Sequence, residues 1–345
     1  MPTWVNSEPA DQGKLTAQQI QQWREQGFTL VHDLLPRKLL EQSVTNAYQH
    51  FPEPGTQAAT KFQGFGSDQK FVFPSPVSDA TNQVTLNNAL LSAVAALLDV
   101  EVDFLRLTQS DLWPKYGRTQ SDYHYDNTDQ RIHCDYPNHY LTHPPHWDSP
   151  EAVEIIIYLS DYADTEGCTA VVPRQGADDP AYPWPIVQTP GVGNLKYVNN
   201  KTNAEEYLAQ VSPETAAFRE ENLYAREVQG RYQFGSVLFY RHDVWHRGTP
   251  VKQNSLRLVH NLTFKRADAH WINVLHPGWA WSMYHPDQFM EKLIATLQPQ
   301  QRAVLGFPAV GDAYWNSQTI DAVNARFGCW GFDPSPYLEA METKS

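Results

Sequence analysis

Two residues near the middle of the chain have the types and spacing of metal ligands. His133 and Asp135 stand two positions apart in a segment that we predict to be a strand. Side chains two apart in a strand point to the same face, whereas Cys134 between them points to the other. One imidazole and one carboxylate on a shared face supply two ligands of the 2-His-1-carboxylate triad, which suits non-haem Fe(II). Alone the signal is weak, because most such pairs bind no metal.

A competing pair of the same kind follows shortly afterwards. His146 and Asp148 also stand two apart, but prolines bracket them, and proline disfavours a sheet interior. We therefore predict a loop there. A metal triad needs ligands that are held rigidly, so we favour His133 and Asp135 and keep the second pair as an alternative.

The third ligand is expected far downstream. His246 and Arg257 stand 11 positions apart, with a Gly-Thr-Pro turn between them. We predict a hairpin that returns the chain to the same pocket. His246 would complete the triad, and Arg257 would reach the distal carboxylate of a 2-oxoacid. The alternatives are a strand-end histidine bonded to backbone and an arginine in a solvated salt bridge.

The helices and strands that must position these residues can be predicted from the spacing of apolar residues and from capping and turn residues. In the first hundred residues we predict helices and one short strand: Thr16 caps a helix with Gln19 in the capping-box position, and Gly27 ends it. A strand at 28–31, a helix at 37–50, a loop at 51–76 and a buried helix at 86–98 follow.

The later part of the chain is predicted to contain the main strands. These are 102–113, 154–159, 169–173 and 232–240, the last broken by a glycine bend. An insertion at 176–229, with helices at 203–208 and 213–227, is a candidate lid, because binding residues concentrate on loops carried by a rigid scaffold. Helices at 287–297 and 319–327 close the chain.

These residues together resemble the phytanoyl-CoA dioxygenase family of Fe(II)/2-oxoglutarate oxygenases. The likeness covers nearly the whole chain. The segments that carry it are 15–31, 133–139, 158–161, 167–174, 246–257, 301–308, 314–315 and 333–337.

The resemblance implies a mainly β fold with α flanks, namely a double-stranded β-helix (jelly-roll, cupin-like) core between N-terminal and C-terminal helices. It implies Fe(II) held by His133, Asp135 and His246. It also implies 2-oxoglutarate bound to iron through its 1-carboxylate and 2-keto oxygens, with its 5-carboxylate on Arg257. Gln109 is a candidate to line the cosubstrate pocket, because a neutral amide can donate to a carboxylate; an ordinary core-edge amide is the alternative.

The implied reaction is hydroxylation of a small molecule by dioxygen, with release of succinate and CO2. Asp135, where a small residue would free a position for halide, argues against halogenation. Desaturation, ring closure and epimerisation use the same cofactors and stay open. A zinc- or manganese-binding jelly-roll enzyme and a non-catalytic binding protein are further alternatives, but neither needs Arg257.

Charge and composition limit the possible partners, the cellular compartment and the substrate class. A net charge of −13 argues against nucleic-acid or anionic-membrane binding, and it weakens the case for an acyl-CoA substrate. Three widely spaced cysteines and a start without a basic or apolar stretch favour the cytoplasm. Abundant aromatics favour an apolar or cationic small-molecule substrate. We expect one domain over 1–345, with flanks at 1–100 and 267–345 around a core at 101–266. Nothing in the sequence indicates the oligomeric state.

Overall fold

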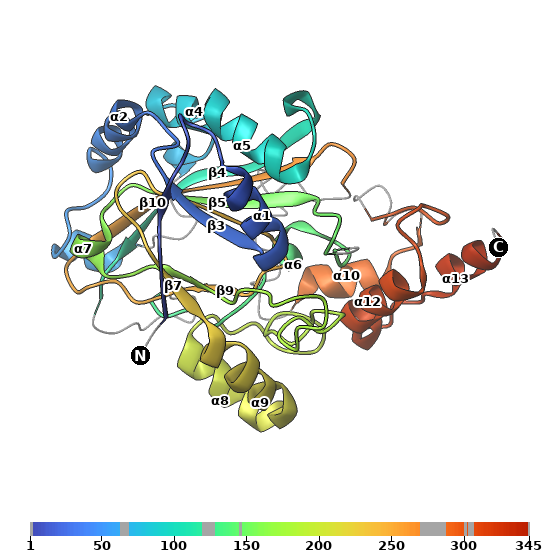
Figure 1. Ribbon diagram of the computed structural model, residues 1–345. Coiled ribbons are helices and arrows are strands. Elements are labelled where there is room, and N and C mark those ends of the chain that lie inside the picture. Colours follow the sequence, from blue (N-terminus) through green and yellow to red (C-terminus); the bar gives the residue numbers. More distant parts are fainter. Residues whose placement is uncertain are drawn as a thin grey trace.

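Two β-sheets face each other in a jelly roll, with helices on the outside (Figure 1). The computed structural model describes residues 3–62, 69–118, 128–144, 147–269, 288–299, 302 and 307–343. Within these ranges helices contribute more residues than strands, but the strands form the centre. No helix in the described ranges has the length and apolar character that crossing a bilayer requires.

The larger sheet has six strands and the smaller has four. The order in the larger sheet is β2 (Glu8–Pro9), β3 (Phe28–His32), β8 (Val237–Tyr240), β5 (Ala152–Tyr158), β10 (Leu256–Arg266) and β4 (Leu105–Tyr116). The order in the smaller sheet is β1 (Thr3–Asn6), β7 (Val228–Arg231), β6 (Thr169–Val171) and β9 (His246–Gly248).

The N-terminal helices cover the outer face of the larger sheet. Helix α1 (Ala17–Gln26) has the predicted capping box of Thr16 and Gln19, and it ends at Gly27 with φ 91°. Helices α2 (Arg37–Tyr48), α4 (Asp79–Thr85) and α5 (Asn88–Leu98) lie over the same face (Figure 1). The loop prediction for 51–76 is wrong in part, because Thr56 caps the short helix α3 (Gln57–Lys61) and a 3-10 turn, Gln69–Phe71, follows.

Apolar side chains from these helices and from the outer face of the sheet make the main core. Trp23, Leu40, Phe71 and Leu90 pack with outward-facing strand residues such as Ile155. Because strand side chains alternate, the opposite set, including Glu154 and Tyr240, points into the space between the two sheets. In the antiparallel register, inward-facing residues of neighbouring strands lie opposite one another and form rows across the sheet. These rows position the side chains of the site.

The insertion at 176–229 carries α8 (Lys201–Val211) and α9 (Pro213–Asn222), beside the smaller sheet (Figure 1). At the other end of the molecule, α10 (Phe289–Thr296), α12 (Ser317–Phe327) and α13 (Ser335–Glu342) enclose an aromatic cluster that includes Trp315, Phe327 and Tyr337. Arg326 fastens α12 to the core by donating to the carbonyls of Pro137, Tyr140 and Thr142.

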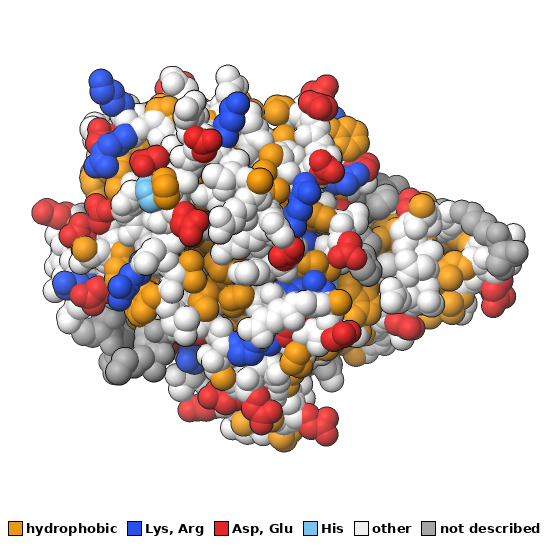
Figure 2. All heavy atoms as spheres, viewed as in Figure 1, with side chains coloured by type: hydrophobic (Ala, Val, Ile, Leu, Met, Phe, Trp, Pro, Cys, Tyr) orange, Lys and Arg blue, Asp and Glu red, His pale blue; other side chains and the backbone are white. Residues whose placement is uncertain are grey.

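Acidic and basic side chains are interspersed over the face shown in Figure 2, and acidic groups gather at the bottom, where α8 and α9 lie. No basic patch dominates this face, in line with the net charge of −13.

Candidate metal centre

The segment that contains His133 runs beside β9 and hydrogen-bonds to it through Gln130 and His133. The backbone N–H of His133 donates to the carbonyl of His246 at 2.9 Å, and the N–H of His246 donates back at 2.8 Å. The predicted strand is therefore wrong in extent: His133 forms an isolated bridge, and the chain turns at Asp135 (φ −90°, ψ −14°) into the short helix α6 (Tyr136–His139).

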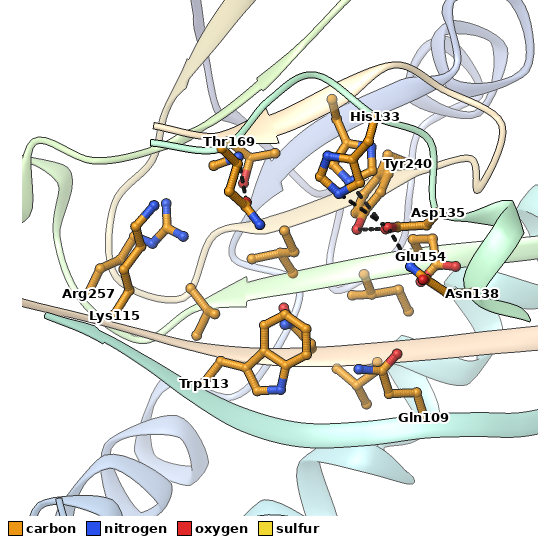
Figure 3. A pocket seen from close by; sticks show the side chains of 18 of the residues that line it. Gln109, Trp113, Lys115, His133, Asp135, Asn138, Glu154, Thr169, Tyr240 and Arg257 are labelled. Atoms are coloured by element: carbon orange, nitrogen blue, oxygen red, sulfur yellow. Dashed lines mark hydrogen bonds and ion pairs between the residues drawn. The ribbon is translucent and has the colours of Figure 1, made fainter. Parts of the chain in front are cut away.

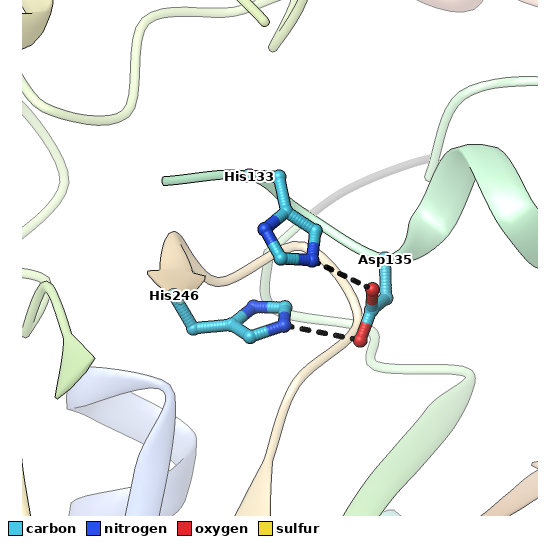
Figure 4. Close-up of side chains that lie close together, drawn as sticks. All are labelled: His133, Asp135 and His246. Atoms are coloured by element: carbon cyan, nitrogen blue, oxygen red, sulfur yellow. Dashed lines mark ion pairs between the residues drawn. The ribbon is translucent and has the colours of Figure 1, made fainter. Parts of the chain in front are cut away.

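Three side chains converge at this bridge (Figure 4). Nε2 of His133 lies 3.5 Å from Asp135 Oδ1, and Nε2 of His246 lies 3.2 Å from Asp135 Oδ2. The two imidazole centroids are 4.4 Å apart. One potential ligand atom from each of the three residues lies within 4.8 Å of the other two. Cys134 points away into an apolar cluster, as predicted.

The hydrogen bonds of the two rings fix which nitrogen faces the centre. Nδ1 of His133 lies 3.0 Å from the carbonyl of Arg131, and Nδ1 of His246 lies 3.0 Å from the carbonyl of Val244. A carbonyl only accepts, so each Nδ1 carries a proton and each ring turns its Nε2 towards a carboxylate oxygen of Asp135. A divalent cation between these atoms would take up the Nε2 lone pairs and the charge of the carboxylate. The donor set therefore fits a metal such as Fe(II).

Protonation also suits metal binding. Burial, followed by the charge of His246, lowers the pKa of His133 to about 4, so its ring is neutral near pH 7. Burial alone would raise the pKa of Asp135, but His246 and His133 hold it well below its usual value. A neutral imidazole and an ionised carboxylate are the forms that coordinate metals.

Two further side chains orient the carboxylate. The hydroxyl of Tyr240 on β8 donates to Asp135 Oδ2 at 2.9 Å, and Nδ2 of Asn138 on α6 donates to Oδ1 at 3.2 Å. Such outer contacts fix the direction of a ligand and commonly change metal affinity when they are lost.

Arg257 shares one pocket with the three converging residues (Figure 3). Its side chain is only 6% exposed, yet Nε and Nη1 have no hydrogen-bond partner among the described residues. Lys115 stands opposite it on β4 and donates to the carbonyl of Thr249 at 2.8 Å. A buried guanidinium with unused donors fits a bound carboxylate.

The predicted hairpin between His246 and Arg257 is wrong. His246 lies on β9 in the smaller sheet and Arg257 on β10 in the larger one, and these strands do not pair. The chain instead crosses from one sheet to the other between Gly248 and Leu256, and Pro250, which cannot donate to a ladder, lies in this connection. The two side chains reach the same pocket from opposite walls.

Gln109 also lines the pocket, but at a different end. It stands in register with Thr263, six residues along β10 from Arg257. Its Nε2 donates to Asp111 at 3.0 Å, and its Oε1 lies 3.5 Å from the Thr263 hydroxyl. Figure 3 shows Gln109 away from Arg257. Its role towards the cosubstrate stays a prediction.

Only one residue of the alternative ligand pair, Asp148, lies in the part of the chain that the structure describes. His146 lies outside the described residues. Asp148 is exposed and lines a surface pocket with Arg24 and Arg241, away from the centre described above. His143, three positions before His146, is buried and accepts from the N–H of Ile186 at 2.9 Å, so it has a structural partner.

Buried arginines brace the backbone beside both histidines. Arg219 of α9 donates to the carbonyl of Ile132 at 3.0 Å and to Glu205 of α8 at 2.7 Å. Arg247, next to His246, pairs with Glu227 at 2.7 Å and with Asp129 at 2.5 Å. The insertion thus supports the ligand segment; its role as a lid stays a prediction.

Sequence reasoning missed Tyr240, Asn138, Lys115 and Glu154. Glu154 could have been noticed from the sequence, because it is the single acidic residue in an apolar predicted strand. Tyr240 and Lys115 left none that pattern alone could read, because their importance comes from register with other strands.

The sequence matches a known protein family. The profile of the family described as phytanoyl-CoA dioxygenase (PhyH) matches residues 23–259. No curated protein matches the sequence.

Solved structures with similar folds have low sequence identity to this chain. EvdO2 from Micromonospora carbonacea var. aurantiaca, complexed with 2-oxoglutarate, is 12% identical with a TM-score of 0.50, covering 81% of this chain and 99% of its own. The carbocyclase SnoK from nogalamycin biosynthesis is 16% identical with a TM-score of 0.48, covering 77% and 89%. Iron-bound HygX from Streptomyces hygroscopicus is 14% identical with a TM-score of 0.46, covering 74% and 88%.

The family match spans well over half of the chain. It covers His133, Asp135, His246 and Arg257, the residues that line one pocket. The chain belongs to the phytanoyl-CoA dioxygenase family and is a non-haem iron, 2-oxoglutarate-dependent oxygenase.

Proposed function

We propose that His133, Asp135 and His246 hold Fe(II), that Arg257 holds the distal carboxylate of 2-oxoglutarate, and that the protein hydroxylates a small molecule. The observation that carries the proposal is the buried guanidinium of Arg257, with Nε and Nη1 unpartnered, in the same pocket as the three converging side chains. Neither a zinc isomerase nor a binding protein with this fold requires a clamp for a cosubstrate.

Each residue has a distinct task in this scheme. The backbone carbonyls of Arg131 and Val244 hold the two imidazoles with Nε2 inward, and Tyr240 and Asn138 hold the carboxylate of Asp135. Iron with its oxoacid supplies the oxidation of substrate by dioxygen, with release of succinate and CO2. Arg257 pairs with the oxoacid by charge-assisted hydrogen bonds, which orient it as well as bind it.

Apolar side chains line part of the inner wall of the pocket. Trp113, Val259 and Ile156 line it between Arg257 and the end near Asp135. Apolar walls lower the local polarity, which strengthens the interactions of the charged groups.

The assignment is tested by adding Fe(II) and then 2-oxoglutarate without oxygen. A weak visible absorption band is expected from an oxoacid bound to iron in this ligand set. Wild type should develop the band; D135A should not, and a D135A protein with an unchanged band would reject the assignment.

The reaction outcome is read from product mass. Hydroxylation adds one oxygen atom, desaturation and ring closure each remove two hydrogens, and epimerisation leaves the mass unchanged. We infer hydroxylation because it requires no further group to redirect the oxidation. A product lighter by two hydrogens, or isobaric with its substrate, would contradict that choice.

We also infer a cytoplasmic enzyme without nucleic-acid or membrane partners. Its three cysteines are unpaired, which suits a reducing compartment. Fractionation of the native host tests this, and recovery with the secreted proteins would contradict it.

A further inference from the structure

The inner face of the larger sheet has two chemically different ends. Rows of side chains cross the strands in register, and the first row pairs Arg257 with Lys115. The last row contains Gln109, Thr263, Glu154 and Tyr240, from β4, β10, β5 and β8. Arg257 and Thr263 are six residues apart on one strand, so the rows are separated by roughly 20 Å at about 3.3 Å per residue.

All of the pocket's lysine and arginine side chains lie at the first end. Among the described residues that line it, these are Lys115 and Arg257. At the other end stands Glu154, which is 4% exposed. Burial, followed by the charge of Asp135, raises the pKa of Glu154 well above its usual value.

Glu154 uses only one of its two oxygens. Its Oε2 accepts a hydrogen bond from the hydroxyl of Thr263. Its Oε1 lies 3.3 Å from Nε2 of His139, but it accepts no hydrogen bond from any described residue. Burial also lowers the pKa of His139 to about 3, so this neighbour supplies no positive charge.

Asn138 presents a second unused acceptor at the same end. Its Nδ2 must face Asp135, because a carboxylate only accepts, and its Oδ1 is then left without a partner among the described residues. Asn138 is 6% exposed and lines the pocket. Figure 3 shows Asn138 and Glu154 side by side, next to Asp135 and on the far side from Arg257.

Buried acceptors without donors are costly, and few native structures leave them so. The oxoacid is a pure acceptor at its carboxylates, so it cannot satisfy them, and its place is at the arginine end. The group that satisfies Oε1 of Glu154 and Oδ1 of Asn138 must donate hydrogen bonds and must sit beside Asp135.

We propose that Glu154 and Asn138 form the recognition end of the substrate site and bind an amine or hydroxyl group of a small polar substrate. This rests on the proposed function, since it takes the arginine end for 2-oxoglutarate. It disfavours substrates that would present only a carboxylate or an unsubstituted acyl chain to this end, because neither offers a donor. An amine and a hydroxyl share the required chemistry, and they differ in whether they need the charge of Glu154.

Three matched probes separate these possibilities: cyclohexylamine, cyclohexanol and cyclohexanecarboxylate. Each is added to anaerobic protein loaded with Fe(II) and 2-oxoglutarate, and the relaxation of probe protons by paramagnetic iron is measured. This reads proximity to the metal without turnover. The absorption band of the loaded protein is checked first; its absence would overturn both the proposed function and this inference.

We expect enhanced relaxation for at least one of the two donor probes and none for the carboxylate. E154Q keeps the shape but cannot ionise opposite a bound ammonium, so it should weaken an amine about tenfold or more and leave an alcohol nearly unchanged. E206Q makes the same substitution at an exposed position of α8 and should behave as wild type.

With the absorption band present, other results overturn the inference alone. The inference is overturned if all three probes relax equally or if none of them does. It is also overturned if cyclohexylamine is the only donor probe that responds and its binding is as strong in E154Q as in wild type. A response to cyclohexanol that persists in E154Q and is lost in N138A identifies the hydroxyl as the recognised group. A response to cyclohexanol that survives in both variants would also overturn the proposal.

Discussion

His133 and His246 exchange both of their backbone hydrogen bonds, at 2.9 and 2.8 Å. In an antiparallel arrangement such a pair sits directly opposite, so the backbone itself sets the separation of the two imidazoles. Asp135 follows where the chain leaves the bridge, and its two oxygens each face one ring. The metal centre is thus built on main-chain pairing rather than on loop side chains alone.

Asp135→Ala should abolish iron binding while leaving the fold intact. The variant removes the anion of the triad, but its neighbours Tyr240 and Asn138 border the pocket, where water can replace the lost acceptor. Iron bound per chain is measured after desalting, with circular dichroism as the check on folding. Asp148→Ala is the matched control, because Asp148 is exposed. Loss of iron in the control and not in Asp135→Ala would move the site to the second pair.

Arg257→Ala should raise the KM for 2-oxoglutarate by about 10- to 100-fold. Hydrogen bonds to charged groups contribute about 1.5–3 kcal/mol, and each 1.4 kcal/mol corresponds to about tenfold. Arg257→Lys should recover only part of the loss, because an ammonium lacks the planar fork. Succinate formation measures the KM. An unchanged KM would show that another group, with Lys115 as the nearest candidate, anchors the oxoacid.

Tyr240→Phe should weaken Fe(II) binding by about tenfold or more, the lower range for outer contacts of metal ligands. The change deletes only the hydroxyl that donates to Asp135 Oδ2 at 2.9 Å and keeps the ring that packs on His246. Competition with a chelator of known affinity gives the constant. Tyr48→Phe, at an exposed tyrosine, is the control. Equal affinities for both variants and wild type would remove Tyr240 from the centre.

Arg219→Ala should reduce the free energy of unfolding by about 3–5 kcal/mol, the range for breaking one side of a buried ion pair. Arg219 is fully buried, and it joins Glu205 to the carbonyl of Ile132 beside His133. Denaturant unfolding measures the loss. Glu206→Ala, at an exposed position of α8 next to Glu205, should change stability by less than about 0.5 kcal/mol. A similar loss of stability in both variants would mean that the stabilisation does not come from the contacts of Arg219.

His260 should make the fold sensitive to acid. Burial lowers its pKa from 6.5 to about 3. Between these values the unfolded chain binds a proton that the native chain does not, so stability falls as pH falls, by about 1.4 kcal/mol per unit for this group. Wild type should therefore lose about 1 kcal/mol more than His260→Gln between pH 6 and pH 5. Denaturant unfolding at both pH values measures the loss of stability. An equal loss in wild type and in His260→Gln would contradict a buried, neutral His260.

Local signals predicted local structure well. The first helix was predictable from Thr16, Gln19 and Gly27, because a cap depends on residues only a few positions apart. The ligand types were likewise readable from His133 and Asp135. The strand expected around them was not, because β structure there depends on one bridge to a distant segment and Asp135 instead opens α6.

Relations between strands could not be read from the sequence. The 11-residue spacing of His246 and Arg257 is compatible with a hairpin or with a crossing between sheets, and only tertiary packing decides. Glu154 was likewise read as part of an apolar strand. Its position opposite Thr263 and Tyr240 follows from register, which a slip of one residue would reverse.

The central claim is that three side chains from two distant segments hold one iron, with Arg257 seating the oxoacid. An iron-edge anomalous difference map from crystals grown without oxygen, with Fe(II) and 2-oxoglutarate, tests it directly. The predicted map has a peak between His133 Nε2, His246 Nε2 and the carboxylate of Asp135, with an oxoacid carboxylate against the Arg257 guanidinium. A peak beside Asp148, or an oxoacid whose distal carboxylate avoids Arg257, would contradict it.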